Sequence, residues 1–330
     1  MNRSYYLFSS GQLKRNNNSL RLFKEDGSYG DIPIETVYDI YSFGDITFNS
    51  DLIDFLGSKG ICLHFFNYYG YYSASLYPRE KLVSGELLVK QVQHYQDDEK
   101  RILLAKLFVK GSVENLLRNL KYYNNRGKDL TAHIESIEKI YSNLWSQQVI
   151  PEVMGIEGNI RKIYYSAWNV IVNQEIDFEK RTKRPPDNMI NCLISLLNSL
   201  LYTKIVSEIY KTQLNPSISY LHQPSTKRFS LSLDIAEIFK PLIADRLIFR
   251  MLNRNMISEK DFVQEEGFLR LKPAKIKDIL KELDDFMLTT VQHRNLNRNV
   301  SYRHLIRLEI YKLIKHLIGE TEYSPFKIWW

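Results

Sequence analysis

The pattern of hydrophobic and polar positions changes near residue 80. Before that point, short apolar or alternating runs are separated by turn residues such as Asn16-Asn17-Asn18, Asp26-Gly27 and Gly60. Short runs between turn signals are typical of β-strands. We expect strands at residues 4–9, 19–23, 32–35, 37–43, 46–48, 61–67 and 70–76, and one helix at residues 50–58 capped by Ser50.

From Lys81 onward, the apolar residues recur with the period of an α-helix. Pro185-Pro186 opens the longest apolar segment, which suits a helix start because the first amides have no intrahelical partner. The sequence predicts an α+β protein: a β-rich domain at residues 1–80, followed by a helical domain at 81–330. Helices are expected at residues 82–94, 102–120, 131–150, 187–213, 231–252, 273–290 and 301–319, followed by an irregular tail. Pro241 is expected to kink the helix at residues 231–252.

Composition narrows the class of protein. With 330 residues, 44% hydrophobic and 25% charged, the chain should be globular and bury a substantial core. No apolar run is long enough to cross a bilayer, and the N-terminus lacks the charged-then-apolar pattern of a secretion signal. We therefore expect a cytoplasmic protein with no membrane partner. Cys62 and Cys192 are the only cysteines, which argues against a disulfide framework or a cysteine-rich zinc site.

The charge balance favours a polyanionic partner. Lys and Arg number 45 against 38 Asp and Glu, which gives a net charge of +7 and a pI near 9.1. The 22 tyrosines could stack on bases, although most are expected to lie between core and surface.

One stretch combines an imidazole with carboxylates. His222 lies in a basic, hydroxyl-rich loop, and Asp234 and Glu237 follow three residues apart, on one face of an expected helix. Glu157 stands between Gly155 and Gly158, and glycines allow close approach of a ligand. One nitrogen and several oxygens suit Mg²⁺ or Mn²⁺ better than a structural zinc. Two alternatives involve no metal ion. The acids could form an acidic first turn that interacts with the helix dipole, and His222 could be an ordinary surface histidine.

Three motifs together resemble a known family, the CRISPR-associated spacer-acquisition integrases. Gly155-Ile-Glu157-Gly158-Asn159 is similar to the family's glutamate motif, and Arg184-Pro185-Pro186 to its helix-opening motif. The block Tyr220-Leu-His222 with Ser232 to Arg246 resembles its histidine and carboxylate motifs. Their order and the β-then-α organisation also match, over nearly the whole chain. Lys240 stands where an arginine is common, Ile238 replaces a frequent proline, Asn188 a frequent aspartate and Asn198 a common aromatic. The tyrosine-rich stretch at residues 65–72 resembles the I-B-type branch.

The resemblance implies a reaction and a ligand set. Glu157, His222 and Glu237 are expected to bind a catalytic Mg²⁺ or Mn²⁺, with Asp234 as a further ligand or a supporting acid. The implied reaction is attack of a protospacer DNA 3′-hydroxyl on a phosphodiester of the CRISPR repeat, and hydrolysis of DNA is the same chemistry with water as the nucleophile. The implied partners are protospacer and repeat or leader DNA, a second copy of the chain bound through the β-rich domain, and a small ferredoxin-like CRISPR-associated subunit.

Several basic residues are candidates for contacts with the DNA backbone. For each of them, a solvated surface position is an alternative of similar weight. The candidates are Arg181, Arg184, Lys227, Arg228, Lys240, Arg294 and Arg298. Arg303 and Arg307 share a helix face and could extend this basic strip. Tyr164 and Tyr165 could lie near the metal or fill the core.

Two other functions remain open at this level. The chain could be a DNA-binding scaffold that keeps the fold but has lost the chemistry. It could also be a stand-alone metal-dependent DNA nuclease. The intact set of ligand types favours the integrase and endonuclease over the scaffold.

Overall fold

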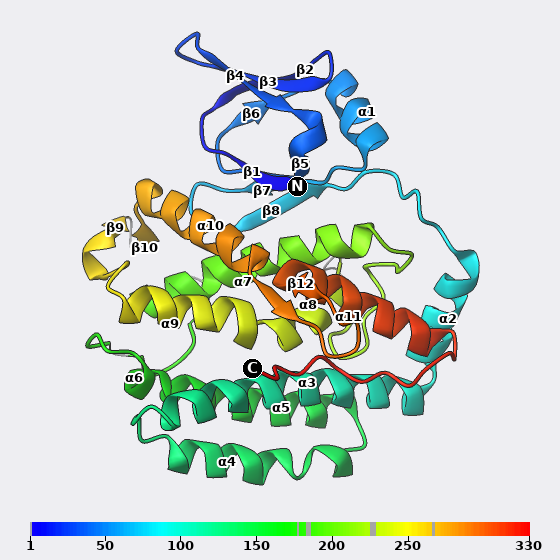
Figure 1. Ribbon diagram of the computed structural model, residues 1–330, viewed down its shortest axis with the longest axis vertical. Coiled ribbons are helices and arrows are strands. Elements are labelled where there is room, and N and C mark those ends of the chain that lie inside the picture. Colours follow the sequence, from blue (N-terminus) through cyan, green and yellow to red (C-terminus); the bar gives the residue numbers. More distant parts are fainter. Residues whose placement is uncertain (1, 177, 183–185, 225–228, 266–267) are drawn as a thin grey trace. The chain divides into compact units, whose positions relative to one another are not determined.

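The computed structural model describes residues 2–176, 178–182, 186–224, 229–265 and 268–330. The chain forms two compact units, Met1–Val83 and Ser84–Trp330, which are treated separately below (Figure 1). The first is rich in strands and the second is largely helical, so the predicted α+β class is confirmed. The roles expected of the two domains stay predictions.

The first unit contains two four-stranded sheets and one helix. One sheet has the order β1-β5-β7-β8, with β1, β5 and β7 parallel and β8 antiparallel; the other has the order β4-β3-β2-β6. Their apolar faces and helix α1 enclose a core that includes Leu13, Leu20 and Ile40. The elements are β1 (Arg3–Leu7), β2 (Gly11–Asn16), β3 (Ser19–Lys24), β4 (Tyr29–Pro33), β5 (Val37–Ser42), β6 (Ile46–Thr47), α1 (Ser50–Lys59), β7 (Leu63–Phe66) and β8 (Tyr72–Leu76).

Two local expectations in this unit were wrong. The side chain of Asn49, not Ser50, caps α1 by accepting a hydrogen bond from the amide of Leu52 at 3.2 Å. Strand β2 was missed because Leu13 is the only large apolar residue in Gly11–Asn16. Strand β2 pairs with β3, which places Leu13 opposite Leu22. This pairing with a neighbouring strand, and not a pattern within residues 11–16, determines that the segment is a strand.

The second unit is built from helices with two short hairpins. The hairpins are β9 (Phe262–Glu265) with β10 (Phe268–Leu271), and β11 (Thr290–Gln292) with β12 (Asn299–Ser301). The helices are α2 (Gly85–Gln96), α3 (Asp98–Asn124), α4 (Thr131–Tyr141), α5 (Ile150–Ser166), α6 (Trp168–Ile171), α7 (Met189–Tyr210), α8 (Leu231–Phe239), α9 (Arg246–Asn253), α10 (Pro273–Leu288) and α11 (Tyr302–Leu317).

The helix expected at residues 131–150 is shorter than predicted. It ends at Tyr141, where Ser142 Oγ and Asn143 Nδ2 donate to the carbonyl of Lys139 at 2.8 and 3.2 Å. Polar side chains that bond nearby backbone groups compete with helix continuation. A new helix, α5, begins at Ile150 with Pro151 in its first turn. Glu157 therefore lies well inside α5.

Helix α7 corrects the expectation that no segment could span a bilayer. Its 22 residues are long and apolar enough to do so by length and composition, although 72% of its most apolar window is buried inside the protein. Met189 to Tyr210 thus serves as a core helix of the second unit, against which α8 and α11 pack.

The expected helix at residues 231–252 is interrupted at Pro241. Helix α8 ends at Phe239, a π-helical turn spans Pro241–Asp245, and α9 follows. Proline cannot donate to the carbonyl of the preceding turn. Two asparagines of α3 donate to carbonyls at this break: Asn115 to Ile238 at 3.0 Å and Asn119 to Pro241 at 2.8 Å. π-Turns are frequent near functional sites.

Candidate active site

Glu157 lies on the solvent-accessible side of helix α5, close in sequence to two glycines. Glu157 is partly exposed, and its glycine neighbours Gly155 and Gly158 are exposed. A Cβ atom added at either glycine would meet no atom within 4 Å. The surface of α5 at these two glycines is therefore open, which leaves room there for a ligand. On the face of Glu157 itself, Met154 lies three residues earlier and is 43% exposed.

Arg161 connects α5 with α8. Its Nε donates to Glu157 Oε1 at 3.2 Å, and its Nη2 donates to Glu237 Oε2 at 2.6 Å. Nη2 also reaches Ser112 Oγ of α3 at 3.2 Å. Two carboxylates from separate helices thus share one guanidinium, and the Arg161 residue as a whole is 8% exposed. Glu157 and Glu237 are brought to the same place.

Glu237 stays ionised although it is buried. Burial disfavours the charged carboxylate, but Lys240, Arg161 and His222 outweigh this and lower the pKa of Glu237 to about 2. Lys240, one turn further along, forms an ion pair with Glu237 Oε1. The carboxylate of Glu237 is therefore a fixed negative charge throughout the physiological range.

Asp234 fixes His222. The carboxylate of Asp234 is fully buried and accepts the backbone amides of Tyr220, Leu221 and His222 at 2.7, 3.0 and 2.9 Å. Its Oδ1 also bonds His222 Nδ1 at 2.8 Å. Both oxygens are thus engaged, which favours the supporting role over direct ligation for Asp234.

The hydrogen bond on Nδ1 leaves Nε2 of His222 as the nitrogen available to a ligand. Burial lowers the pKa of His222, but the bond and charge of Asp234 and the charge of Glu237 raise it overall. A carboxylate behind a histidine is the usual arrangement for a metal-binding imidazole, because it fixes the tautomer and ring orientation.

The donor types fit a hard divalent cation, but they are not gathered into a finished site. Within the described residues, no group of three His, Cys, Asp or Glu side chains is placed to hold a metal ion. Both oxygens of Glu237 are bound by Arg161 and Lys240, and Oε1 of Glu157 is bound by Arg161. These two cations balance the charge that a metal ion would balance. A metal ion bound here would compete with Arg161 and Lys240 for these carboxylate oxygens.

Asp245 is a second buried acid beside Arg161. It lies at the end of the π-turn, and its Oδ2 has no hydrogen-bond partner among the described residues. Burial raises the pKa of Asp245 to about 7, against the opposing effects of Arg161 and a hydrogen bond from Tyr164. Tyr164 and Tyr165 are themselves buried, and their rings pack against Trp168.

The basic candidates have different surroundings. Arg181 donates to Asn191 Oδ1 at 3.0 Å and to Ser195 Oγ at 2.8 Å, so its guanidinium holds the start of α7. Lys240 pairs with Glu237, as described above. Arg294 and Arg298 are exposed. Arg184, Lys227 and Arg228 lie outside the described residues.

The rest of the expected basic strip faces inward. Arg303 is buried, and Arg307 forms an ion pair of 2.6 Å with the buried Glu208 of α7. The two arginines tie α11 into the unit, which makes them unsuitable for tracking DNA.

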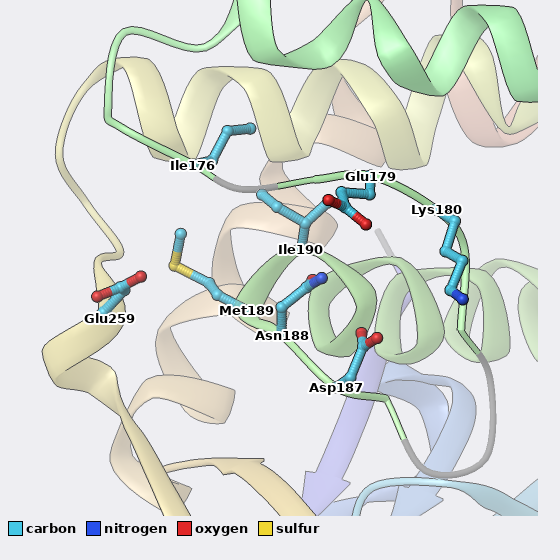
Figure 2. Close-up of a pocket in the computed structure, with 8 residues that line it drawn as sticks. All are labelled: Ile176, Glu179, Lys180, Asp187, Asn188, Met189, Ile190 and Glu259. Carbon is cyan, nitrogen blue, oxygen red and sulfur yellow. The ribbon is translucent and has the colours of Figure 1, made fainter.

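A pocket of about 290 Å³ lies elsewhere, at the start of α7 (Figure 2). Glu179, Asp187 and Glu259 contribute carboxylates to its wall, together with the ammonium group of Lys180. Figure 2 shows these carboxylates spread around the pocket instead of directed to one point. The chemistry of the candidate site is therefore on α5, α8 and the His222 loop, away from this hollow.

The sequence interpretation missed Arg161 and Asp245 as site residues, and it assigned Lys240 to DNA and not to Glu237. Arg161 could have been found from its spacing, because a cation four residues after Glu157 shares its helix face. Lys240 stands three residues after Glu237 in the same relation. The role of Asp245 had no such signal, because it depends on the π-turn that sets the direction of the chain after Pro241.

Comparison with known proteins identifies the family. Residues 5–285 match the family of CRISPR associated protein Cas1. The CRISPR-associated endonuclease Cas1 of Fusobacterium nucleatum is 56% identical over 330 residues, which cover 100% of this chain and 98% of that protein. The structure of a CAS1 protein from Thermotoga maritima has a TM-score of 0.87 at 43% identity, covering 98% of this chain and 100% of that one.

Two more distant structures share the fold. A casposase bound to an integration product has a TM-score of 0.87 at 20% identity, covering 98% of this chain and 92% of that one. A chain of a Cas6-RT-Cas1–Cas2 complex has a TM-score of 0.83 at 19% identity, covering 99% of this chain and 36% of that one. The family match over residues 5–285 and the full-length relative at 56% identity define a CRISPR-associated protein. The chain belongs to the Cas1 family, which confirms the resemblance found in the motifs; its I-B-type branch stays a prediction.

Proposed function

We propose that the protein is the endonuclease and integrase of CRISPR adaptation, which joins a protospacer 3′-hydroxyl to a phosphodiester of the CRISPR repeat. One observation carries the proposal beyond family membership. Glu157 and Glu237, from helices far apart in the sequence, meet at Arg161, and His222 is close enough to Glu237 for each to shift the pKa of the other. The proximity of these side chains from three elements supports a common site.

Glu157, His222 through Nε2 and Glu237 would hold Mg²⁺ or Mn²⁺. The bound ion supplies Lewis acidity, which lowers the pKa of the attacking hydroxyl and neutralises charge on the phosphate and the leaving oxygen. Asp234 holds the imidazole in one tautomer and orientation. Arg161 and Lys240 keep the buried carboxylate of Glu237 in place and ionised until the ion binds.

The open surface at Gly155 and Gly158 supports DNA as the substrate. A nucleic-acid backbone is wide, and side chains beside the reacting phosphate would obstruct it. The surface of α5 at Gly155 and Gly158 is open, which agrees with a ligand of this width. The net charge of +7 favours the same class of ligand.

The partners follow from the same proposal. DNA is the substrate, a second copy of the chain binds through the β-rich unit, and a small ferredoxin-like subunit bridges the dimers. In support, one structural neighbour is a DNA-bound casposase and another a complex of Cas1 with Cas2. In the β-rich unit, Tyr68 and Tyr69 are 61% and 38% exposed, as residues of an interface would be, whereas Phe66 belongs to the core.

A strand-joining assay tests the function. The purified protein is incubated with a splayed duplex and a repeat-containing plasmid, in Mn²⁺, Mg²⁺ or a chelator. We expect joined product with either ion and none with the chelator. A protein that binds the DNA but gives neither cleavage nor joining in either ion would be a scaffold.

A further inference from the structure

A groove lined by tryptophans and cations lies outside the candidate active site. It consists of two hollows that share Arg294 and Trp329, with volumes of about 460 and 360 Å³. The first lies between the β11–β12 hairpin and the tail, and includes His293 and Trp330. The second lies between the tail and α3, and includes Arg118, Lys121 and Lys327. We call this surface the tryptophan groove.

The tail that carries Trp329 is firmly held. Asn115 of α3 donates to the carbonyl of Phe326 at 3.1 Å and accepts the amide of Ile328 at 2.8 Å. Glu309 of α11 accepts the amide of Phe326 at 2.9 Å. A ring positioned by fixed backbone loses little conformational entropy when a ligand stacks on it.

Trp329 is partly exposed and stands within a group of rings. The ring centroids of Trp330, Phe326 and His293 lie 4.7, 5.7 and 5.7 Å from that of Trp329. The Arg294 guanidinium lies 5.6 Å over the Trp329 ring. Burial, together with the charges of Lys312 and Arg298, lowers the pKa of His293, so its imidazole is neutral near pH 7. The groove offers flat, uncharged surfaces beside a guanidinium.

The groove carries a surplus of positive charge. Its walls contain the side chains of Arg118, Lys121, Arg294 and Lys327 against the single side-chain carboxylate of Glu114. Lys121 and Lys327 are paired with Glu138 and Glu114. Within the described part of the chain, Arg294 forms no ion pair with a carboxylate, which leaves its charge available to an anion. Arg118 forms no ion pair with an Asp or Glu side chain there, and its Nε donates to the backbone oxygen of Trp330 at 3.2 Å.

We propose that the tryptophan groove binds an unpaired segment of DNA, with a base stacked on Trp329 and phosphates bound by Arg294 and Arg118. Rings stack on bases of any sequence, and cations follow the backbone, which is how proteins hold single strands. Duplex DNA does not meet this requirement because its bases are already stacked. The choice of DNA over RNA rests on the proposed function; the stacking site itself does not.

Photocrosslinking locates the contact. An oligothymidylate of about 15 nucleotides that contains 5-iododeoxyuridine is irradiated with the full-length protein in a chelator, and crosslinked peptides are identified by mass spectrometry. We expect a crosslink at Trp329 or Trp330 that excess single-stranded DNA removes and equal duplex DNA does not. Crosslinks found only elsewhere would overturn the proposal.

Substitutions measure the contribution of the ring. By fluorescence anisotropy, Trp329→Leu should weaken binding of the oligothymidylate about 5- to 100-fold, whereas Trp329→Phe, which keeps a ring, should stay within about threefold of the wild type. Arg294→Glu should also weaken binding. Trp145, which is 47% exposed on the 3-10 turn Leu144–Ser146, offers a matched control in Trp145→Leu.

The outcomes separate the two proposals. Equal affinities of Trp329→Leu and Trp145→Leu would refute the groove, and the melting curve of each variant shows whether it is folded. About tenfold tighter binding of an RNA of matching sequence would refute DNA as the ligand. If the wild type binds single-stranded DNA at the tryptophan groove but joins no strands, the proposed function would be contradicted and the proposed binding site would remain supported.

Discussion

Arg161 donates to Glu237 at 2.6 Å across 76 positions of sequence, and the same guanidinium holds Glu157 at 3.2 Å. A protein cation thus stands between the two carboxylates that we assign to a metal ion. This relationship explains how the buried Glu237 remains charged in the absence of an ion. It also predicts how the protein responds when Arg161 is removed.

Arg161→Ala should destabilise the protein by about 3–5 kcal/mol, because it leaves Glu237 buried without one of its partners. Mn²⁺ should then restore more stability to Arg161→Ala than it adds to the wild type, since the freed oxygens bind the ion only in the folded state. Thermal unfolding with and without Mn²⁺ measures both effects.

The matched control is Arg307→Ala, which breaks the buried pair with Glu208 and should not respond to Mn²⁺. Equal Mn²⁺ effects in the two variants would show that Arg161 does not stand in for the metal ion.

Asp234→Asn should lower the affinity for Mn²⁺ about 10- to 100-fold, because the imidazole of His222 loses its orienting carboxylate. The pKa of His222 should fall at the same time, since Asp234 raises it. Calorimetric titration gives the affinity, and NMR of the imidazole gives the pKa. Asp284→Asn, at the ion pair with Lys204, is the control. If the pKa of His222 falls while the Mn²⁺ affinity is unchanged, Asp234 serves only to hold the loop that contains His222.

Asp245→Asn should alter the pH dependence of stability. The pKa of Asp245 is raised to about 7 in the folded state from an ordinary value of 3.8. The folded protein therefore holds this proton more tightly than the unfolded chain, so the stability due to Asp245 is full below about pH 4 and is lost as the pH rises to about 7.

Between pH 5 and 8 the wild type should lose about 2 kcal/mol relative to Asp245→Asn. Urea unfolding at both pH values measures this difference. Glu237, with its pKa lowered to about 2, loses its contribution only as the pH falls from about 4.5 toward 2, outside this range. A difference that does not change with pH would mean that Asp245 is ionised in the folded protein.

Gly158→Leu separates DNA binding from folding. The site is exposed and open, and leucine is a better helix former, so the variant should gain about 0.5–1 kcal/mol in stability. It should nevertheless bind a splayed duplex about tenfold more weakly, because the side chain projects where the DNA approaches. Anisotropy in a chelator measures binding, and Gly85→Leu, at the open start of α2, is the control. Wild-type affinity of Gly158→Leu would place the DNA elsewhere.

The sequence predicted the elements that carry their own periodicity and missed those defined by tertiary contacts. The long helices α3 and α7 lie where the apolar spacing placed them, and Pro241 marks the break in the helix at residues 231–252. Strand β2 and the two hairpins of the helical unit had no such pattern. Within the site, the spacing of Asp234 and Glu237 was readable from the sequence. The sequence did not show that Asp234 supports His222 while Glu237 would bind the metal ion, because this difference depends on which backbone amides donate to Asp234.

The most direct measurement is the position of the ion itself. Crystals soaked in Mn²⁺ and measured at the manganese absorption edge would show it as an anomalous peak. We predict a peak within bonding distance of Glu157, His222 Nε2 and Glu237, with the Arg161 guanidinium displaced from at least one carboxylate. A peak only in the pocket of Glu179, Asp187 and Glu259, with the Arg161 ion pairs intact, would contradict the assignment.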